Sequence, residues 1–308
     1  MGLFGRIHRP AAIYFGLIVH REASVIRRSI LPRAISYFVC LLLALTATSL
    51  AQSQPTDRDI YERFREWVTR QPPAPARQTS GTAKQPDLLT QYRDALRAKG
   101  VAPPEIDRQI RVINEQGRVL EIERWNVILT SPKPAFNTSP NAFLMQIAKR
   151  RTPGTALDVG MGQGRNAIYL AQQGWTVTGF DPAERAVSAA REQAKRLGVQ
   201  LDARVAEDST FDWGKDKWDL VLLSYVGVRQ MAPRVIESLR PGGMVVVEAF
   251  HRDATKTSSI GGGVVFDTNE LLTIFQSLRV LHYEDAKAVG DFGGTTETRV
   301  VRLAAEKM

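Results

Sequence analysis

Residues 156–164 read ALDVGMGQG, and this stretch decides the fold. One acid, Asp158, lies inside an apolar run just ahead of three alternating glycines, Gly160, Gly162 and Gly164. An apolar-periodic helical segment and a second strand, WTVTGF, follow, and the second strand ends in another acid. Strand, glycine loop, helix, strand and acid in this order are typical of a parallel α/β sheet that binds an adenosine-containing cofactor.

The spacing of these glycines bears on the identity of the cofactor. A dinucleotide-binding loop reads G-x-G-x-x-G, because the pyrophosphate must lie against a helix N-terminus. Here the glycines fall at every second position, and the Asp158 carboxylate ahead of them would repel a pyrophosphate. That carboxylate suits the ammonium group of an amino acid, and the glycines let the backbone approach a ligand closely. The alternative interpretation is that these are turn glycines of any α/β protein.

On these residues the sequence resembles the class I S-adenosylmethionine-dependent methyltransferases. Asp158 matches the acid of that family's first strand, and Gly160, Gly162 and Gly164 match its glycine loop. The resemblance implies that Asp181, at the end of the second strand, holds the ribose hydroxyls of S-adenosylmethionine, because a carboxylate can accept two hydrogen bonds. An N-cap for the next helix is a second role for this acid.

Two longer runs narrow the resemblance within the class. They are GQGRNAIYLAQQGWTVTGFD (162–181) and FDTNELLTIFQSLRVLHYED (266–285). Both are similar to the small-molecule methyltransferases of the tellurite-resistance and thiopurine-type group. The resemblance covers about residues 137–305.

Further site residues follow from their positions at strand ends, where open α/β sheets bind ligands. Arg165 and Asn166 open the helix after the loop and are predicted to hydrogen-bond the methionine part of the cofactor, or else to form a solvated helix terminus. Asp208 matches the acid that the family places against the adenine amino group, with a solvated loop acid as the alternative. Ser224 and Tyr225 end the fourth strand, where the family places residues near the transferred methyl group. His251 is the candidate base for an acceptor that must lose a proton, or else a polar loop residue.

Strands and helices alternate regularly from residue 141 onward. Strands are predicted over 156–159, 176–180, 200–205, 219–224 and 244–249, alternating with helices over 142–150, 165–173, 183–197, 232–239 and 268–277. Two final strands, 279–286 and 298–303, flank the glycine-rich DFGGTT and indicate a hairpin. The prediction is an α/β, Rossmann-like, doubly wound, mostly parallel seven-stranded sheet with a C-terminal antiparallel hairpin. Residues 241–243, Pro-Gly-Gly, are predicted to form a tight turn before the fifth strand.

The chain before this domain divides by composition. Residues 1–51 end in an uncharged apolar run preceded by arginines and followed by small residues, which is the layout of a signal peptide or signal anchor. Residues 52–86 indicate a flexible linker around one short amphipathic stretch, and residues 87–136 a helical extension. The methyltransferase domain is predicted over 137–308. The apolar run at 35–50 is shorter than the ~20 residues of a comfortable membrane span.

The net charge of +9 is distributed unevenly along the 308 residues. Residues 1–51 carry +5, residues 52–136 carry +3 and residues 137–308 carry +1. A basic nucleic-acid face on the domain is therefore not expected, and the excess before the apolar run indicates a membrane topology signal. That signal predicts a membrane-anchored or exported protein, associated with the membrane through residues 35–51, in tension with cytoplasmic supply of the cofactor. The single cysteine, Cys40, excludes a disulfide framework or cysteine-cluster metal site, and no metal is expected.

The sequence thus predicts an enzyme that transfers a methyl group from S-adenosylmethionine to an unidentified small-molecule acceptor. Nucleic acid is disfavoured as the acceptor, because SYVG (224–227) stands where an Asn/Asp-Pro-Pro-aromatic motif would follow the fourth strand. One alternative is a non-catalytic protein that binds S-adenosylmethionine or a nucleoside. The second alternative is a nicotinamide-dependent oxidoreductase, although its dinucleotide-binding loop requires the third glycine one residue later.

Overall fold

A computed structural model describes four stretches of the chain, residues 54–71, 87–256, 262–292 and 297–308. The chain divides into two units, Met1–Gln54 and Pro55–Met308, and the fold below belongs to the second. The predicted signal or anchor segment and Cys40 lie outside the described residues. Within the described stretches, no helix combines the length and the apolar character needed to cross a membrane.

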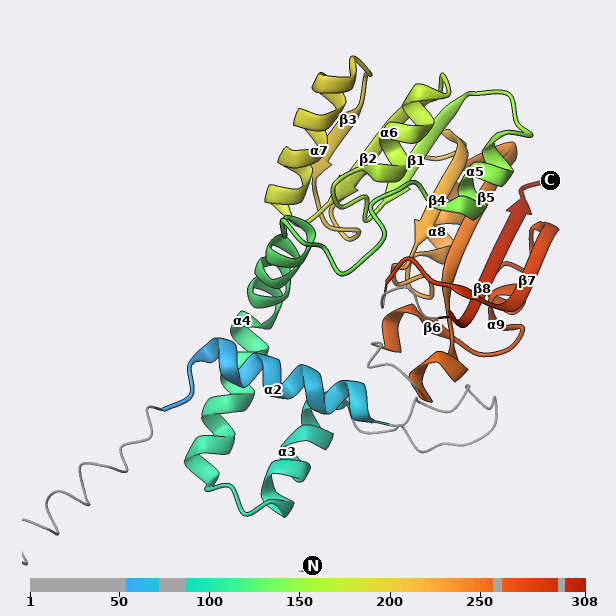
Figure 1. Cartoon of the computed structure of the whole chain (residues 1–308). Coiled ribbons are helices and arrows are strands. Elements are labelled where there is room, and N and C mark those ends of the chain that lie inside the picture. Colours follow the sequence, from blue (N-terminus) through green and yellow to red (C-terminus); the bar gives the residue numbers. More distant parts are fainter. Residues whose placement is uncertain (1–53, 72–86, 257–261, 293–296) are drawn as a thin grey trace, which may run out of the picture. The chain divides into compact units, whose positions relative to one another are not determined.

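The core of the domain is a mixed eight-stranded sheet (Figure 1). Its strands are β1 (Thr155–Val159), β2 (Thr176–Asp181), β3 (Asp202–Val205), β4 (Trp218–Ser224), β5 (Leu239–His251), β6 (Val265–Phe266), β7 (Arg279–Val289) and β8 (Glu297–Glu306). The order is β3-β2-β1-β4-β5-β8-β7, and the short β6 pairs with β5 off this path. Strands β1 to β5 are parallel, while β8 is antiparallel to both β5 and β7. The predicted sheet and hairpin are confirmed, with β6 as an addition.

The strand order fixes where a ligand can bind. The chain runs outward from β1 through β2 to β3 and then returns to place β4 on the other side of β1. The topological switch point therefore lies between the carboxyl ends of β1 and β4. Because β7 runs parallel to β5, the carboxyl end of β7 reaches the same edge of the sheet.

Helices cover both faces of the sheet, as alternating side chains along buried strands require. Ala156 and Leu222 share a core cluster with one set of helices, whereas their neighbours Leu157 and Leu223 share another with the opposite set. The first set includes α5 (Ala142–Ala148) and α6 (Arg165–Gln172), and the second α8 (Ala232–Ser238) and α9 (Glu270–Ile274). Helix α7 (Glu184–Leu197) packs beside β2 and β3. Two 3₁₀ turns, η1 (Arg252–Lys256) and η2 (Gly262–Val264), follow β5.

The prediction of a tight turn before the fifth strand at residues 241–243 is wrong, because these residues lie inside β5. Strand β5 already begins at Leu239, and residues 240–243 bulge from it where β4 has only Asp219 between the paired positions. Gly242 has φ +80°, and a Cβ on Gly243 would lie 2.6 Å from the Trp218 carbonyl oxygen. The glycines therefore serve a bulge inside the strand rather than a turn between two elements.

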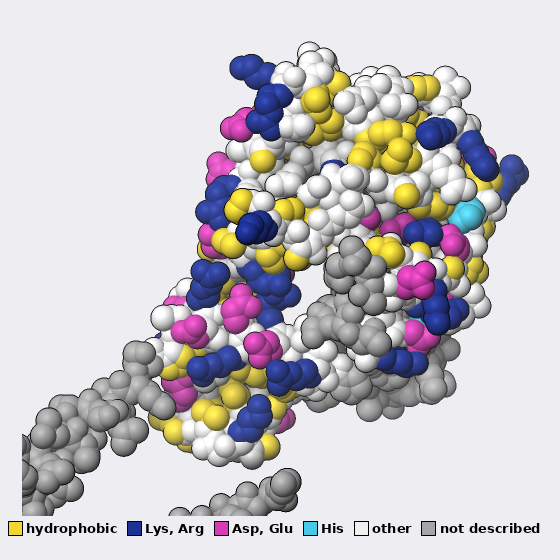
Figure 2. Space-filling view, viewed as in Figure 1, with side chains coloured by type: hydrophobic (Ala, Val, Ile, Leu, Met, Phe, Trp, Pro, Cys, Tyr) yellow, Lys and Arg dark blue, Asp and Glu magenta, His cyan; other side chains and the backbone are white. Residues whose placement is uncertain are grey.

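Three helices form the extension, α2 (Asp57–Arg70), α3 (Leu88–Ala98) and α4 (Pro103–Leu129). Helix α2 lies inside the segment predicted as a flexible linker, and it starts at a capping box between Thr56 and Asp59. It is ordered because Ile60 is fully buried in a cluster with residues of α3 and α4. On the face drawn in Figure 2, basic and acidic side chains are interspersed over these helices.

The C-terminal end of α4 connects the extension to the domain that holds the sheet. The N-cap residue of α7, Ala183, has no polar side chain, and Asn126 of α4 supplies the missing acceptor to the Arg185 N–H at 2.9 Å. Leu129, in the last turn of α4, packs against Ala183 and Ala186. The end of α4 is therefore fixed next to the glycine loop.

Candidate cofactor site

The glycine loop after β1 has a conformation that other residues would strain. Gly160, Gly162 and Gly164 have φ of +65°, +54° and +75°. A Cβ on Gly160 would lie 2.6 Å from Val226 Cγ1, and a Cβ on Gly164 would lie 2.9 Å from the Ala190 Cβ. The sequence thus places glycine where both the backbone angle and the space require it.

Asp181 fastens this loop to the start of α7. Its Oδ2 accepts a hydrogen bond from the Gly162 N–H at 3.0 Å, and its Oδ1 accepts one from the Ala183 N–H at 2.8 Å. Burial raises the pKa of this carboxyl, and the two N–H groups only partly oppose the shift. Each oxygen keeps a second lone pair, so the predicted contact with ribose hydroxyls is compatible with these bonds and stays a prediction.

Asp158 lies inside β1, two residues before the glycine loop, and is not among the residues that line the pocket at the switch point. Its side chain is buried, and its Oδ2 has no hydrogen-bond partner among the residues that the structure describes. Burial raises its pKa to about 7, against the opposing charge of Arg165. Ser224 Oγ, at the end of β4, is likewise buried without a partner in the described part of the chain. Five other side chains among the described residues also hold a buried polar atom without a partner, but these two oxygens lie near the switch point of the sheet, where a polar ligand would complete them.

A small pocket of about 40 Å³ lies at the switch point, between the glycine loop and Ser224. Leu129, Phe136 and Phe292 line it as well, and the two phenylalanine rings stack with their centroids 5.3 Å apart. Ligand pockets usually hold ~300 Å³ or more. The wall made by these three apolar side chains thus leaves less room than a nucleoside-sized ligand needs.

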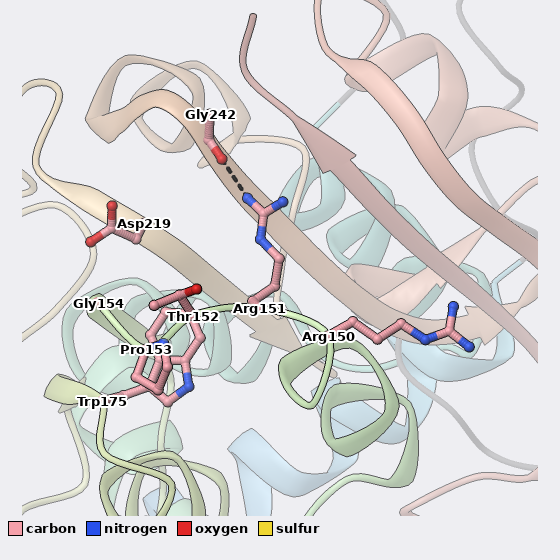
Figure 3. A pocket seen from close by; sticks show the side chains of 8 residues that line it. All are labelled: Arg150, Arg151, Thr152, Pro153, Gly154, Trp175, Asp219 and Gly242. Carbon is pink, nitrogen blue, oxygen red and sulfur yellow. Dashed lines mark hydrogen bonds between the residues drawn. The ribbon is translucent and has the colours of Figure 1, made fainter.

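A larger hollow of about 450 Å³ lies at the opposite edge of the sheet, at the amino ends of the strands (Figure 3). It is lined by Arg150, Arg151, Thr152, Pro153, Gly154, Trp175, Asp219 and Gly242. Arg151 is paired with Glu306, and Asp219 accepts the Thr155 N–H. Open α/β sheets bind their ligands beyond the carboxyl ends of the strands, so we assign the cofactor to the pocket at the glycine loop.

The structure brings Asn166 into the pocket but leaves Asp208 outside the residues that line it. Asn166 is buried, and its Oδ1 accepts the Asn141 N–H at 2.8 Å. Asp208 is exposed at 41% and lies 3.6 Å from the Arg234 guanidinium. The predicted contacts of Asn166 with methionine and of Asp208 with adenine stay predictions.

Tyr225 was predicted to act near the methyl group, but its phenol is already bonded. The hydroxyl donates to Glu248 Oε1 at 2.7 Å and accepts the Asp291 N–H at 3.1 Å. Burial and the Glu248 carboxylate raise the pKa of this phenol. Glu248 Oε2 in turn accepts from Arg302 Nε at 2.7 Å. The phenol is therefore held in a buried chain of bonds.

His251, the predicted base, has both ring nitrogens occupied. Nδ1 accepts the Asp253 N–H at 3.1 Å, which assigns the proton to Nε2, and Nε2 donates to Thr268 Oγ1 at 2.9 Å. The described residues that line the pocket do not include His251. Acting as a base would require it to break one of these bonds, and that role stays a prediction.

Asp291 is a further residue of the site, and the sequence did not predict it. This buried acid accepts hydrogen bonds from Arg165, Asn141 and Asn137, and its neighbour Phe292 lines the pocket. The only signal in the sequence was an acid at the start of the glycine-rich DFGGTT, at the carboxyl end of a predicted strand.

Comparisons with known proteins agree with this geometry. Residues 156–243 match the model of the family described as "Methyltransferase domain". The chain is 25% identical over 181 residues to Hemagglutinin 1 of Eikenella corrodens, covering 55% of this chain and 60% of that protein. It is 33% identical over 105 residues to the ubiquinone biosynthesis O-methyltransferase of Paramagnetospirillum magneticum, covering 32% and 42%.

A third relative can be compared with the group of small-molecule methyltransferases that residues 162–181 and 266–285 resemble. The chain is 22% identical over 158 residues to TehB of Haemophilus influenzae, a probable S-adenosyl-L-methionine-dependent methyltransferase, covering 49% of this chain and 55% of that protein. The chain thus spans between two fifths and three fifths of the length of these relatives. The likeness to TehB agrees with the group that residues 162–181 indicated. Residues 156–243 of the chain are therefore similar to a methyltransferase domain.

Proposed function

We propose that this protein is a methyltransferase that uses S-adenosylmethionine bound at the glycine loop and methylates a small-molecule acceptor. One observation carries the proposal: a buried Asp158 oxygen without a partner lies beside a glycine loop at the switch point of the sheet. The match of residues 156–243 to a methyltransferase family supports it, as does the O-methyltransferase relative.

Each residue of the site is proposed to bind a different part of the cofactor. Asp158 provides an anionic oxygen for the ammonium group, and the glycine loop lets backbone N–H groups reach the ligand. Asp181 offers its remaining lone pairs to the ribose hydroxyls, and Ser224 Oγ, at the end of β4, offers a further polar contact to the cofactor. The cofactor supplies a methyl group on an electrophilic sulfonium. The protein then has to orient the acceptor and exclude water, and the wall of Leu129, Phe136 and Phe292 is suited to the second task.

Calorimetric titration of the full chain with S-adenosylmethionine, S-adenosylhomocysteine and NAD tests the proposal. We expect micromolar binding of the first two, ~8 kcal/mol, and no binding of NAD. Binding of NAD alone would favour the oxidoreductase. Binding of the sulfur nucleosides without turnover on a panel of phenol, thiol, amine and metalloid acceptors would favour the non-catalytic binding protein.

We also propose, from the sequence alone, that residues 35–51 bring the chain to a membrane or across it. The uncharged apolar run and the arginines before it support this proposal. Cell fractionation of the full chain beside a chain that begins at residue 52 tests it. Equal amounts of both in the soluble cytoplasmic fraction would count against the proposal and would remove the tension with cofactor supply.

A further inference from the structure

Asp291 forms hydrogen bonds with residues from several separate segments of the chain near the pocket. Its Oδ2 accepts from Arg165 Nη2 at 2.6 Å and from Asn141 Nδ2 at 2.8 Å, and its Oδ1 accepts from Asn137 Nδ2 at 2.9 Å. Its backbone N–H donates to the Tyr225 hydroxyl at 3.1 Å, and its carbonyl oxygen accepts the Asn137 N–H at 2.7 Å. These bonds hold the carboxylate in one place and leave it little freedom to rotate.

Arg165 is the charged partner of this acid and lies beside the cofactor site. It is the first residue of α6, directly after Gly164, and it lines the pocket. The side chains of Arg165 and Asp291 are only 13% and 8% exposed, and Arg165 Nη1 donates to the Ser139 carbonyl at 2.7 Å. Its charge also acts on Asp158, whose pKa it lowers against the effect of burial. One guanidinium thus lies within electrostatic reach of two buried acids.

The two acids differ in what surrounds them. Asp291 receives three side-chain hydrogen bonds, whereas Asp158 Oδ2 receives none from the described residues. An unpaired buried carboxylate is costly, so Arg165 would gain by turning to Asp158 if nothing held it. What holds it is the bond to Asp291, together with the bond to the Ser139 carbonyl.

We propose that Asp291 is a positioning residue that holds Arg165 away from Asp158 and so keeps the Asp158 carboxylate open for the cationic end of the cofactor. The inference rests on the proposed function, because the cation in question is the ammonium group of S-adenosylmethionine. Without the Asp291 carboxylate, Arg165 pairs with Asp158 and the chain blocks its own binding site. Asp291 reaches the cofactor only through Arg165.

A double-mutant cycle tests this arrangement in the full chain. Calorimetry with S-adenosylmethionine compares the wild type, Asp291→Asn, Arg165→Gln and the double variant. We expect Asp291→Asn to weaken binding about tenfold in the wild-type background and less than about twofold in the Arg165→Gln background, because the competing guanidinium is then absent. An equal loss in both backgrounds would show a merely structural role and would overturn the inference.

Two controls keep the result interpretable. Glu270→Gln alters another acid paired with an arginine, Arg229, in the same domain but outside the set of residues that line the pocket, and it is expected to leave the affinity within about twofold. Circular dichroism and thermal melting report whether each variant folds. If wild-type protein binds neither S-adenosylmethionine nor S-adenosylhomocysteine, the proposed function fails and this inference fails with it; binding with additive losses overturns the inference alone.

The pH dependence of binding gives a readout that a structural role would not move. Besides burial, the groups that act on the pKa of Asp158 are Arg165 and the Ala167 N–H from α6, which lower it, and Asp181 from β2, which raises it. In the wild type, affinity should rise with pH as Asp158 ionises, near its pKa of about 7. In Asp291→Asn, Arg165 pairs with Asp158 and lowers that pKa, so the midpoint should move to lower pH. An unmoved midpoint would contradict the inference.

Discussion

Two groups of buried polar residues lie along the carboxyl edge of the sheet, and they differ in their partners. On the cofactor side, Asp158 and Ser224 hold oxygens without hydrogen-bond partners among the described residues. In the second group, Tyr225, Glu248 and Arg302 are buried or largely buried. The Tyr225 hydroxyl and Arg302 Nε each donate a hydrogen bond of 2.7 Å to the Glu248 carboxylate. We call the first group the unpartnered pair and the second the bonded chain. Burial does not separate the two groups, so only the missing partners point to a ligand.

The two groups should respond differently to substitution. The polar atoms of the bonded chain are hydrogen-bonded to one another, which stabilises the fold. Removing one member leaves the others buried without hydrogen-bond partners. The unpartnered pair costs folding free energy and recovers it when a ligand supplies the missing contacts. Substitutions in the bonded chain should therefore change stability more than cofactor affinity, and substitutions in the unpartnered pair should do the reverse.

The largest expected effect is on the bonded chain. Glu248→Ala removes the buried acceptor of both the Tyr225 hydroxyl and Arg302 Nε, which should lower the free energy of unfolding by about 3–5 kcal/mol. Urea denaturation measures the change. Glu284→Ala is the matched control, because Glu284 also pairs with Arg302 at 3.1 Å but is 35% exposed, and its loss should cost about 0–1 kcal/mol. Equal losses for the two variants would break the comparison.

The next effect concerns the pH dependence of stability. The pKa of Asp158 is about 7 in the folded chain and thus above its unfolded value, ~3.9, so between these values the folded state holds a proton that the unfolded state has released. The free energy of unfolding should therefore fall as pH rises from about 4 to 7, by at most about 1.4 kcal/mol per pH unit from this group. Asp158→Asn should lack that part of the fall, and the difference between the two proteins separates Asp158 from Asp181. Parallel profiles would mean that Asp158 ionises normally.

The unpartnered pair is tested next at the level of binding. Asp158→Asn keeps the size of the side chain but removes its charge, so the affinity for S-adenosylmethionine should fall by about 1.5–3 kcal/mol, the usual worth of a hydrogen bond to a charged group. The same change should leave the free energy of unfolding at neutral pH unchanged or raise it. Calorimetry and urea denaturation of one preparation measure both quantities. A loss of stability with unaltered affinity would place Asp158 with the bonded chain.

Sequence reasoning found the parts of the site that local motifs encode. The acid, the three glycines and Asp181 lie within 24 residues of chain, and each has a physical reason that spacing alone reveals. The parallel sheet with helices on both faces followed from the alternation of strands and helices, which is likewise a local pattern. The amphipathic stretch that became α2 was recognised too, but its packing depends on Ile60 meeting α3 and α4.

What the sequence did not reveal depends on contacts between distant segments. Asp291 meets Arg165 and Asn141 across 126 and 150 positions, and no local pattern marks it. Tyr225 and His251 were correctly placed at strand ends, but only the folded chain shows that their polar atoms already have partners. A position at the right edge of the sheet was thus a necessary condition for a catalytic role and not a sufficient one.

The smallest effect sharpens the comparison at His251, which was predicted as a base and has the bonds of a structural residue. His251→Ala removes an acceptor for the Asp253 N–H and a donor to Thr268, and Asp253 is 42% exposed, so the free energy of unfolding should fall by only about 1 kcal/mol. Cofactor affinity should stay within about twofold, because His251 is outside the set of residues that line the pocket. Thermal melting and calorimetry measure these two quantities, and turnover on an identified acceptor decides the role. Full turnover places His251 with the bonded residues, whereas a large loss at unchanged affinity means that the imidazole leaves Thr268 or Asp253 during the reaction and serves the acceptor.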